Sequence, residues 1–565
     1  MLAVELSRNF ELKKKDPKLY PSKTVLIGAT LVAIMNLGAA SPAAAQQTPN
    51  EKSSAEMAQE IRALREQVEA LQRRLDAQIQ SEQQAKAAAD AAAAQAAAAK
   101  AAVAGIPAQV QSAVDAAKPK TDKIYYKGAT ITLGGFLAAE YVYRSRDTTN
   151  DISTAYNKNY FQNNSVADTS QTVFTARQTR VSALVQGDPN PQTHLGFYTE
   201  LDFQGAAQTA NSNESNSYNP RLRHLYGTVD WDDMHLHLLA GQAWSLVTLD
   251  GKGIIPGTEI YPPTVDGQYM PGYTWARQPQ IRLTQDIARQ FWMSVSLENP
   301  QTTFYTGANA LPASVHLTYE QTGTGLGFNS ANTLSLNHIP DAIFKMAGDP
   351  SIGDWTMHVE AFGLYSSFYE RLNYSNQTDS GGGVGGGLRL PLWPGLLDFQ
   401  VSGLVGKGIG RYGSGQLPEV TFDPSGNIQP IHELIAMAGL TLHASRRLDV
   451  YLFAGQEKED PQAYNMTTGT GATATVVPYG YGNLKYSNTG CASETAAGAC
   501  IGNEHLVEQG TTGFWYKPYI GNYGMIRWGV QYSHTEFKAF PGAGGAPIAI
   551  DNMVFASFRY YPFNN

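Results

Sequence analysis

The sequence predicts an all-β protein, a transmembrane antiparallel β-barrel of about sixteen strands preceded by an N-terminal α-helical coiled coil. Two observations lead to this fold class. From residue 123 to the end, segments such as "FWMSVSLE" (291–298) and "IRWGVQYS" (526–533) alternate apolar with polar residues, and alternate residues of a strand face opposite sides of a sheet. Before them, residues 57–78 repeat apolar residues at heptad spacing, which is typical of a coiled coil.

The composition agrees with a membrane-embedded barrel. Among 565 residues there are 54 Gly and 30 Tyr, and only 16% are charged, against roughly 25% in ordinary soluble domains. The formal net charge is −8. An acidic chain is repelled by phosphate backbones, so no nucleic-acid partner is expected.

The first element is a signal peptide over residues 1–45. Five lysines precede the apolar run "TVLIGATLVAIMNLGAA" (24–40), and an Ala-x-Ala cleavage site ends at Ala45. A membrane anchor is the alternative. The run is short for a spanning helix, and the small-residue site follows it immediately, which favours cleavage.

The second element, residues 46–122, is predicted to be a coiled coil followed by an Ala-rich linker. Apolar residues recur at steps of four and three, and the Ala/Lys/Gln segment 85–104 continues the helical bias until Pro107 breaks it. The alternative is a single amphipathic helix lying on a domain. The heptad positions are Met57, Ile61, Leu64, Val68, Leu71 and Leu75.

The third element, residues 123–565, is the barrel. In "LGFYTELDFQ" (195–204), one face carries Leu and Phe, and the other carries Glu200 and Asp202. Such a strand suits lipid on one side and a watery lumen on the other, and in lipid the strands must close into a cylinder because no edge can stay unpaired. A soluble propeller is the alternative, but no blade repeat is present.

The connections also fit a barrel, because short turns and long loops alternate along the chain. The expected short turns are 187–192, 231–233, 286–289 and 392–395, and the expected long loops are 145–171, 205–219, 248–275 and 458–510.

Six motifs in order between residues 176 and 300 resemble the DcaP-like porin family of Gram-negative outer membranes: "ARQTRVSAL", "YTELDF", "PRLRHLYG", "LLAGQAWSL", "ARQPQIRLTQ" and "SLENP". The resemblance implies a homotrimeric barrel among outer-membrane lipids, a periplasmic coiled coil and a preference for small anions such as dicarboxylates. The last segment, "VFASFRYYPF", resembles the terminal strand read by barrel-assembly machinery. After residue 300 only the general pattern matches.

The candidate pore residues are charged. Guanidinium groups grip carboxylates bidentately, and opposed rows of arginines and carboxylates would set up a transverse field that attracts anions. Parity places Arg180 and Arg282 in the lumen and is ambiguous for Arg177, Arg221 and Arg223. Each arginine could instead be a structural partner of a carboxylate. The set is Arg177, Arg180, Arg221, Arg223, Arg277 and Arg282, with Glu200 and Asp202 on a neighbouring strand.

The loop 248–275, which is rich in proline and contains Glu259 and Asp266, is expected to fold inward and narrow the pore. The alternative is a surface loop at the trimer contact. Cys491 and Cys500, nine residues apart in a polar loop of an exported chain, are expected to form a disulfide.

No catalytic motif is found, and no cofactor or metal is expected. The sequence therefore predicts a passive, trimeric diffusion channel for small carboxylated solutes, not an enzyme. The rival hypothesis is an envelope-tethering protein whose coiled coil binds peptidoglycan or another periplasmic partner. A third, an outer-membrane barrel enzyme, would need a triad assembled from distant strands.

Overall fold

The computed structural model describes residues 54–103, 123–158, 160–205, 219–307, 309–322, 333–353 and 355–563. The predicted signal peptide, 1–45, and most of the predicted linker lie outside the described residues. The chain divides into two compact units, Met1–Pro119 and Lys120–Asn565, and each is described by itself.

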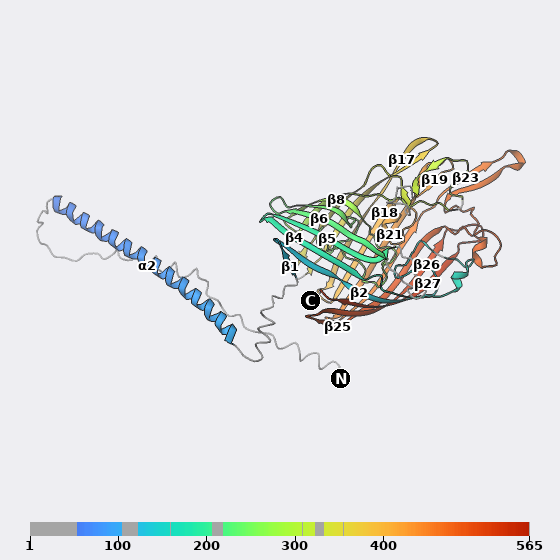
Figure 1. The fold of residues 1–565 in the computed structure, drawn as a ribbon. Coiled ribbons are helices and arrows are strands. Elements are labelled where there is room, and N and C mark those ends of the chain that lie inside the picture. The colour runs from blue at the N-terminus through green and yellow to red at the C-terminus, as the bar shows by residue number, and fades with distance from the viewer. Residues whose placement is uncertain are drawn as a thin grey trace, which may run out of the picture. The chain divides into compact units, whose positions relative to one another are not determined.

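In the first unit, the described residues form one helix of 50 residues, α2 (Ser54–Val103) (Figure 1). It contains both the heptad segment and the Ala-rich segment, since Ala, Gln, Glu, Lys and Arg are strong helix formers. Leu71 and Leu75 are 65% and 58% exposed. The described heptad positions, Val68, Leu71 and Leu75, are thus uncovered within one chain, and the coiled coil stays a prediction. No described helix is long and apolar enough to cross a membrane.

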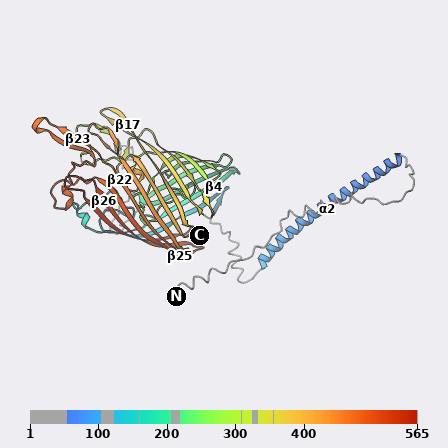
Figure 2. The same cartoon turned by 180° about the vertical axis from the view of Figure 1, so that it is seen from behind.

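The second unit is a closed antiparallel barrel (Figures 1 and 2). Nineteen strands share one sheet; setting aside the short β1 and β10, and counting β3 and β4 as parts of one interrupted strand, leaves sixteen around the barrel. The last strand, β27, pairs with the first, β2, which leaves no open edge. The predicted barrel and its strand number are confirmed.

The strands around the barrel are β2 (Ala129–Arg144), β3 (Gln171–Thr175) with β4 (Arg180–Asn190), β5 (Thr193–Gly205), β6 (Asn219–Trp231), β7 (Leu236–Trp244), β8 (Arg277–Ile287), β9 (Phe291–Glu298), β13 (Asp341–Gly348), β16 (His358–Leu372), β17 (Ser375–Trp393), β18 (Leu397–Lys407), β21 (His432–Ser445), β22 (Leu448–Glu459), β25 (Glu504–Gly521), β26 (Gly524–Ala539) and β27 (Ile548–Tyr561).

The remaining elements are short. Alongside β16 and β2 lie β10 (Leu317–Thr318) and β1 (Lys123–Tyr126), and four small hairpins stand in connections: β11 (Glu320–Thr322) with β12 (Thr333–Ser335), β14 (Ser351–Ile352) with β15 (Trp355–Thr356), β19 (Val420–Phe422) with β20 (Ile428–Pro430), and β23 (Gln462–Thr468) with β24 (Thr475–Tyr481). Four 3₁₀ turns are η1 (Ser165–Asp168), η2 (Gly410–Tyr412), η3 (Gly471–Thr473) and η4 (Thr489–Ala492).

Short and long connections separate to the two ends of the barrel. One end, the short-turn end, carries tight connections such as 191–192, 288–290 and 446–447. The other end carries long loops, including 145–170, 245–276, 299–340, 408–431 and 460–503. The exception at the loop end is the tight turn between β16 and β17. The expected Cys491–Cys500 disulfide is present in the 460–503 loop.

The two faces of the wall differ as the alternation predicts. On β8, Ile281 and Leu283 point outward and are exposed, whereas Arg282 and Thr284 point inward and are buried. The neighbouring strand β9 repeats the pattern, with Val295 outward. An apolar outer face and a polar inner face suit a lipid-embedded barrel.

Removing residues 46–122 should leave a barrel that still folds and inserts. The reason is that every strand of the closed sheet lies after residue 122. Folding is measured by the heat-modifiable migration of the refolded protein on gels, and insertion by conductance in planar bilayers. Both are compared with the full-length protein. A truncated protein that never reaches the compact migrating form would contradict the prediction.

Candidate functional site

The long loop between β7 and β8, residues 245–276, lies inside the barrel. Its Val265, Met270 and Tyr273 are fully buried. Two parts of the inner wall hold it: the Trp515 indole on β25 donates to the Pro263 carbonyl at 2.7 Å, and the Gly272 amide donates to Glu457 on β22 at 2.8 Å. We call this segment the inner loop. The inner loop narrows the lumen, as expected from the sequence for a loop that folds inward.

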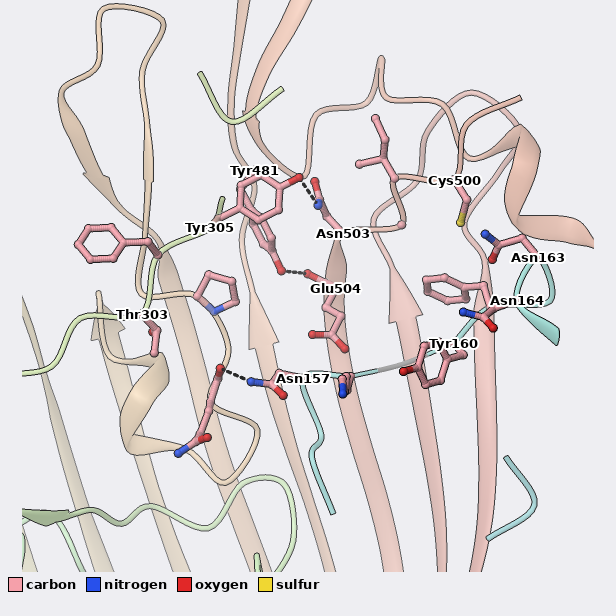
Figure 3. A pocket seen from close by; sticks show the side chains of 17 residues that line it. Asn157, Tyr160, Asn163, Asn164, Thr303, Tyr305, Tyr481, Cys500, Asn503 and Glu504 are labelled. Carbon is pink, nitrogen blue, oxygen red and sulfur yellow. Dashed lines mark hydrogen bonds between the residues drawn. The ribbon is translucent and has the colours of Figure 1, made fainter. Parts of the chain in front are cut away.

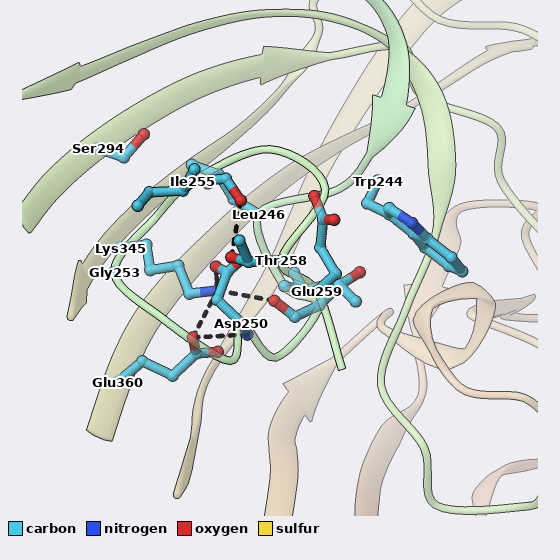
Figure 4. Close-up of polar contacts among 12 residues, drawn as sticks. Trp244, Leu246, Asp250, Gly253, Ile255, Thr258, Glu259, Ser294, Lys345 and Glu360 are labelled. Atoms are coloured by element: carbon cyan, nitrogen blue, oxygen red, sulfur yellow. Dashed lines mark hydrogen bonds and ion pairs between the residues drawn. The ribbon is translucent and has the colours of Figure 1, made fainter. Parts of the chain in front are cut away.

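The first half of the inner loop is held by a buried lysine (Figure 4). Lys345 on β13 is fully buried, and its ammonium donates to the Thr248 carbonyl at 2.7 Å and to Asp250 at 2.8 Å. The Glu360 carboxylate, from β16, lies 2.8 Å from the same nitrogen and accepts the Asp250 amide at 3.1 Å. One cation therefore binds two carboxylates and joins the loop to two strands.

A histidine and a glycine near Lys345 also help to hold the first half of the inner loop against the wall. His358 lies between Asp349 at 2.6 Å and Glu360 at 3.0 Å. On β17, the inward-facing Gly387 leaves room for the loop, because a Cβ there would lie 2.5 Å from the Leu249 side chain. The glycine run 381–387 thus serves close packing, as its place in a strand predicts.

The predicted arginines and carboxylates gather on the wall formed by β4, β5 and β6. In the strand register Arg180 lies opposite Asp202, which lies opposite Arg221. Arg221 grips Asp202 with two hydrogen bonds, at 3.0 and 2.7 Å. Arg223 bonds Glu200 and, at 3.1 Å, Asp202. Arg180 is looser, 3.9 Å from Glu200.

This arrangement corrects the expectation of opposed charged rows. Glu200 and Asp202 stand on β5, between the arginines of β4 and β6, so both signs share one wall. A field directed from this wall across the lumen must come from the excess of arginines, and not from the carboxylates.

Arg277, at the start of β8, supplies much of that excess. Its guanidinium packs against two adjacent indoles, 5.1 Å from the Trp244 ring centre and 5.2 Å from that of Trp275. Its Nε and Nη1 atoms are buried with no hydrogen-bond partner in the described part of the chain. The charges of Arg180, Arg221 and Arg223 all act on it. Four guanidiniums and two carboxylates leave two positive charges in excess. We call these six residues the arginine cluster.

The other two predicted arginines stand apart from this cluster. Arg177 lies in the interruption between β3 and β4, which explains why its parity was ambiguous, and it donates to the Phe203 carbonyl at 3.1 Å and to that of Gly205. Arg282 faces inward as predicted, but it is buried and donates to Gln280 and to the Trp244 carbonyl. Both hold backbone in place.

Asp266, on the inner loop, is buried and tied to the first long loop. Its carboxylate accepts the Thr154 hydroxyl at 2.6 Å, the Tyr156 hydroxyl at 3.2 Å and the Gln268 amide at 2.8 Å. Its place is therefore structural, joining loop 145–170 to the inner loop.

Glu259 is the second inner-loop carboxylate, and it is only half-buried. It accepts the Gly257 amide at 2.8 Å, and Figure 4 shows it turned away from the Lys345 ion pairs. Burial, and next the nearby Asp250 carboxylate, raise the pKa of Glu259 to about 7. Its charge therefore changes within the neutral range.

Replacing Glu259 with Gln should raise the preference for anions at pH 8 and leave it unchanged at pH 5.5. Above the raised pKa the native side chain is charged and repels anions; below it the side chain is neutral, like Gln. Reversal potentials in a salt gradient at the two pH values measure this. Glu494→Gln, in an exposed part of another loop, is the matched control and should have no effect. Equal effects of Glu259→Gln at both pH values would contradict the assignment.

Inward-facing arginines beyond residue 300, among them Arg527 and the buried Arg559 on β27, were missed because only the first half of the chain carried motifs. Arg527 on β26 lies 4.2 Å from the Trp515 ring centre, and its Nε has no hydrogen-bond partner among the described residues. The alternation of 526–533 already placed it opposite the apolar face, so parity could have found it.

A cavity of about 630 Å³ opens at the loop end, where four long loops meet (Figure 3). Amide and aromatic side chains line it, and the Asn503 amide donates to the Tyr305 hydroxyl at 2.8 Å. The disulfide-bonded Cys500 also borders it. The cavity forms a polar, nearly uncharged mouth above the arginine-rich interior.

Comparison with solved structures identifies the fold. The outer membrane channel DcaP of Acinetobacter baumannii matches with a TM-score of 0.55 and 17% sequence identity, over 78% of this chain and 99% of that one. The chain has the fold of that channel. This agrees, at the level of the fold, with the resemblance carried by the sequence motifs, and the closed barrel with an apolar outer face is the architecture of outer-membrane proteins.

Weaker matches include an anion-selective porin from Comamonas acidovorans, with a TM-score of 0.41 and 11% identity over 77% of this chain and 99% of that one. Salmonella typhi OmpF in complex with daunomycin matches with a TM-score of 0.41 and 10% identity over 78% and 99%. No family model and no curated protein sequence matches the chain.

Proposed function

We propose that the protein is an outer-membrane porin of a Gram-negative bacterium, through which small hydrophilic solutes diffuse, with a preference for small anions such as dicarboxylates. The observation that carries the proposal is the arginine cluster. It places two uncompensated positive charges on the lumen wall, beside the loop that narrows the pore.

The chemistry of the cluster favours carboxylates. Arg221 and Arg223 are held by Asp202 and Glu200, whereas Arg277 has unused, buried donors and Arg180 has only a distant carboxylate. The positive charges of Arg180 and Arg277 are the least compensated of the cluster, and such charges attract carboxylates strongly in a narrow, low-dielectric passage. A dicarboxylate would be attracted by both arginines.

The assembly is part of the proposal. Residues 1–45 direct export, residues 46–122 form the periplasmic coiled coil and linker, and residues 123–565 form the barrel, which the barrel-assembly machinery inserts among outer-membrane lipids. The uncovered heptad positions Val68, Leu71 and Leu75 of α2 support a homotrimer, because a coiled coil buries such positions against its own copies.

The same positions favour a second candidate, an envelope tether in which α2 binds peptidoglycan or another periplasmic partner and the pore is incidental. Catalysis is not proposed, because the chain shares its fold with an outer membrane channel.

Ion conductance of the purified protein in planar bilayers tests the proposal. A KCl gradient should give a reversal potential of the sign expected for chloride preference, and added succinate should lower the chloride current, while succinamide, of the same size but uncharged, should not. The absence of conductance would leave the tether as the function. Cation preference, or equal effects of succinate and succinamide, would overturn the anion proposal.

A further inference from the structure

A row of alternating carboxylates and imidazoles crosses five adjacent strands at the short-turn end. Asp188, His194, Asp230, His237 and Asp286 come from β4, β5, β6, β7 and β8 in turn. The strand register places His194 opposite Asp230, and Asp230 opposite His237. Their positions in the alternation point them into the lumen. We call this set the histidine row.

His194 and His237 each meet a carboxylate at both ring nitrogens. His194 lies 2.7 Å from Asp188 and 3.3 Å from Asp232. His237 lies 2.7 Å from Asp230 and 3.1 Å from Asp286. A neutral imidazole carries one N–H and can donate to only one of two carboxylates, whereas the protonated form donates to both.

A third imidazole joins the row from the turn between β6 and β7. His235 lies 3.2 Å from Asp286, so that one carboxylate serves two histidines. The side chains of His194 and His237 are 38% and 31% exposed, and they border a cavity of about 430 Å³ between the wall and the tip of the inner loop. Solvent reaches them, so their protonation follows the pH of the lumen.

The charge of this wall depends strongly on protonation. Asp188, Asp230, Asp232 and Asp286 supply four negative charges, and Arg289, 3.9 Å from Asp232, supplies one positive charge. With neutral imidazoles the sum is −3, and protonation of His194 and His237 brings it to −1. Two other charged groups lie nearby: Asp233 adds a negative charge in the turn, and Arg282 adds a positive charge above the row. Their charges cancel, so the sum is unchanged.

The far side of the same end is not negative. Arg389 pairs with Asp398 at 2.8 Å, and Lys517 pairs with Asp449 at 2.6 Å. His443 lies between the two carboxylates, and the turn between β21 and β22 adds the exposed Arg446 and Arg447. The wall formed by β4 to β8 is therefore the negatively charged side of this end.

We infer that the histidine row is a second electrostatic filter, separate from the arginine cluster, whose selectivity is set by pH. At alkaline pH its carboxylates hold cations at the short-turn end and oppose anions. On acidification the imidazoles of His194 and His237 become charged, the wall loses most of its negative charge, and anions pass more easily. The inference rests on the pore of the proposed function but not on the anion preference of the arginine cluster.

Reversal potentials of the full-length protein in a KCl gradient, at pH 8 and at pH 5.5 in both chambers, test the inference. All variants carry Glu259→Gln and His443→Gln, so that neither of these groups contributes. In that background the anion-to-cation permeability ratio should rise about two- to threefold on acidification. Adding His194→Gln, His235→Gln and His237→Gln should abolish the rise, since Gln keeps hydrogen-bonding capacity without a titrating charge.

His505→Gln is the matched control. This histidine lies at the loop end, where it contacts the Glu459 carbonyl, and its replacement should leave the rise intact. If the triple variant does not assemble, the single variants His194→Gln and His237→Gln should each lower the rise by about half. A ratio that does not change with pH in the background protein, or a rise that persists in the triple variant, overturns the inference. A protein that conducts no ions would instead refute the proposed function.

Discussion

Replacing both Arg180 and Arg277 with Ser should abolish the preference for anions. These two arginines carry the excess positive charge of the cluster, because Asp202 and Glu200 compensate Arg221 and Arg223. Their removal brings the sum over the cluster from +2 to zero. We expect the anion-to-cation permeability ratio to fall about three- to tenfold at low salt, with the barrel still assembled.

Reversal potentials in a KCl gradient measure this ratio. The effect should shrink in 1 M salt, where the Debye length falls to about 3 Å. Arg371→Ser removes a positive charge from an exposed side chain near the turn between β16 and β17 and should change the ratio far less. A double variant that assembles and keeps the native preference would show that the two arginines are structural partners and that selectivity lies elsewhere.

Replacing Lys345 with Met should detach the first half of the inner loop. The substitution keeps most of the side-chain volume but leaves the buried Asp250 and Glu360 carboxylates facing each other without a cation. Breaking a buried ion pair in this way costs about 3–5 kcal/mol of stability. The variant should unfold at lower temperature, and its single-channel current should be larger and noisier, because the inner loop no longer holds one position.

Thermal unfolding in detergent and single-channel recording measure the two effects. A double variant, Lys345→Met with Asp250→Asn, removes one of the stranded charges and should recover part of the stability, whereas Lys458→Met, on the exposed outer face, should change neither property. A Lys345→Met protein with native stability and a quiet, native current would show that the ion pairs do not hold the loop.

The local pattern of the sequence was sufficient to predict the wall of the barrel. A strand has a period of two residues, and lipid on one side and water on the other impose opposite demands on its faces. The alternation of 291–298 and 526–533 therefore predicted which side chains point outward, and the inward placement of Arg282 followed from parity alone. Parity failed at Arg177, because the strand is interrupted there and the count of residues no longer gives the face.

The sequence could also predict that arginines and carboxylates cluster, but it could not predict how they pair. Pairing depends on the register between strands, which is set by the closure of the whole sheet. Register places Asp202 between Arg180 and Arg221, and so turns two expected opposed rows into one mixed wall.

Local residue patterns establish the class of the protein: a barrel of about sixteen strands with an apolar exterior, a charged interior and long loops at one end. Which charges act on the lumen depends on how distant segments pack. The path of the inner loop buries Asp266 and Arg282 and leaves Glu259 half-exposed, and the curvature of the wall brings three histidines against four aspartates. Three of these histidine contacts join residues 38 to 51 positions apart, and the other two cross the hairpins β4–β5 and β6–β7, so the register between strands decides all of them.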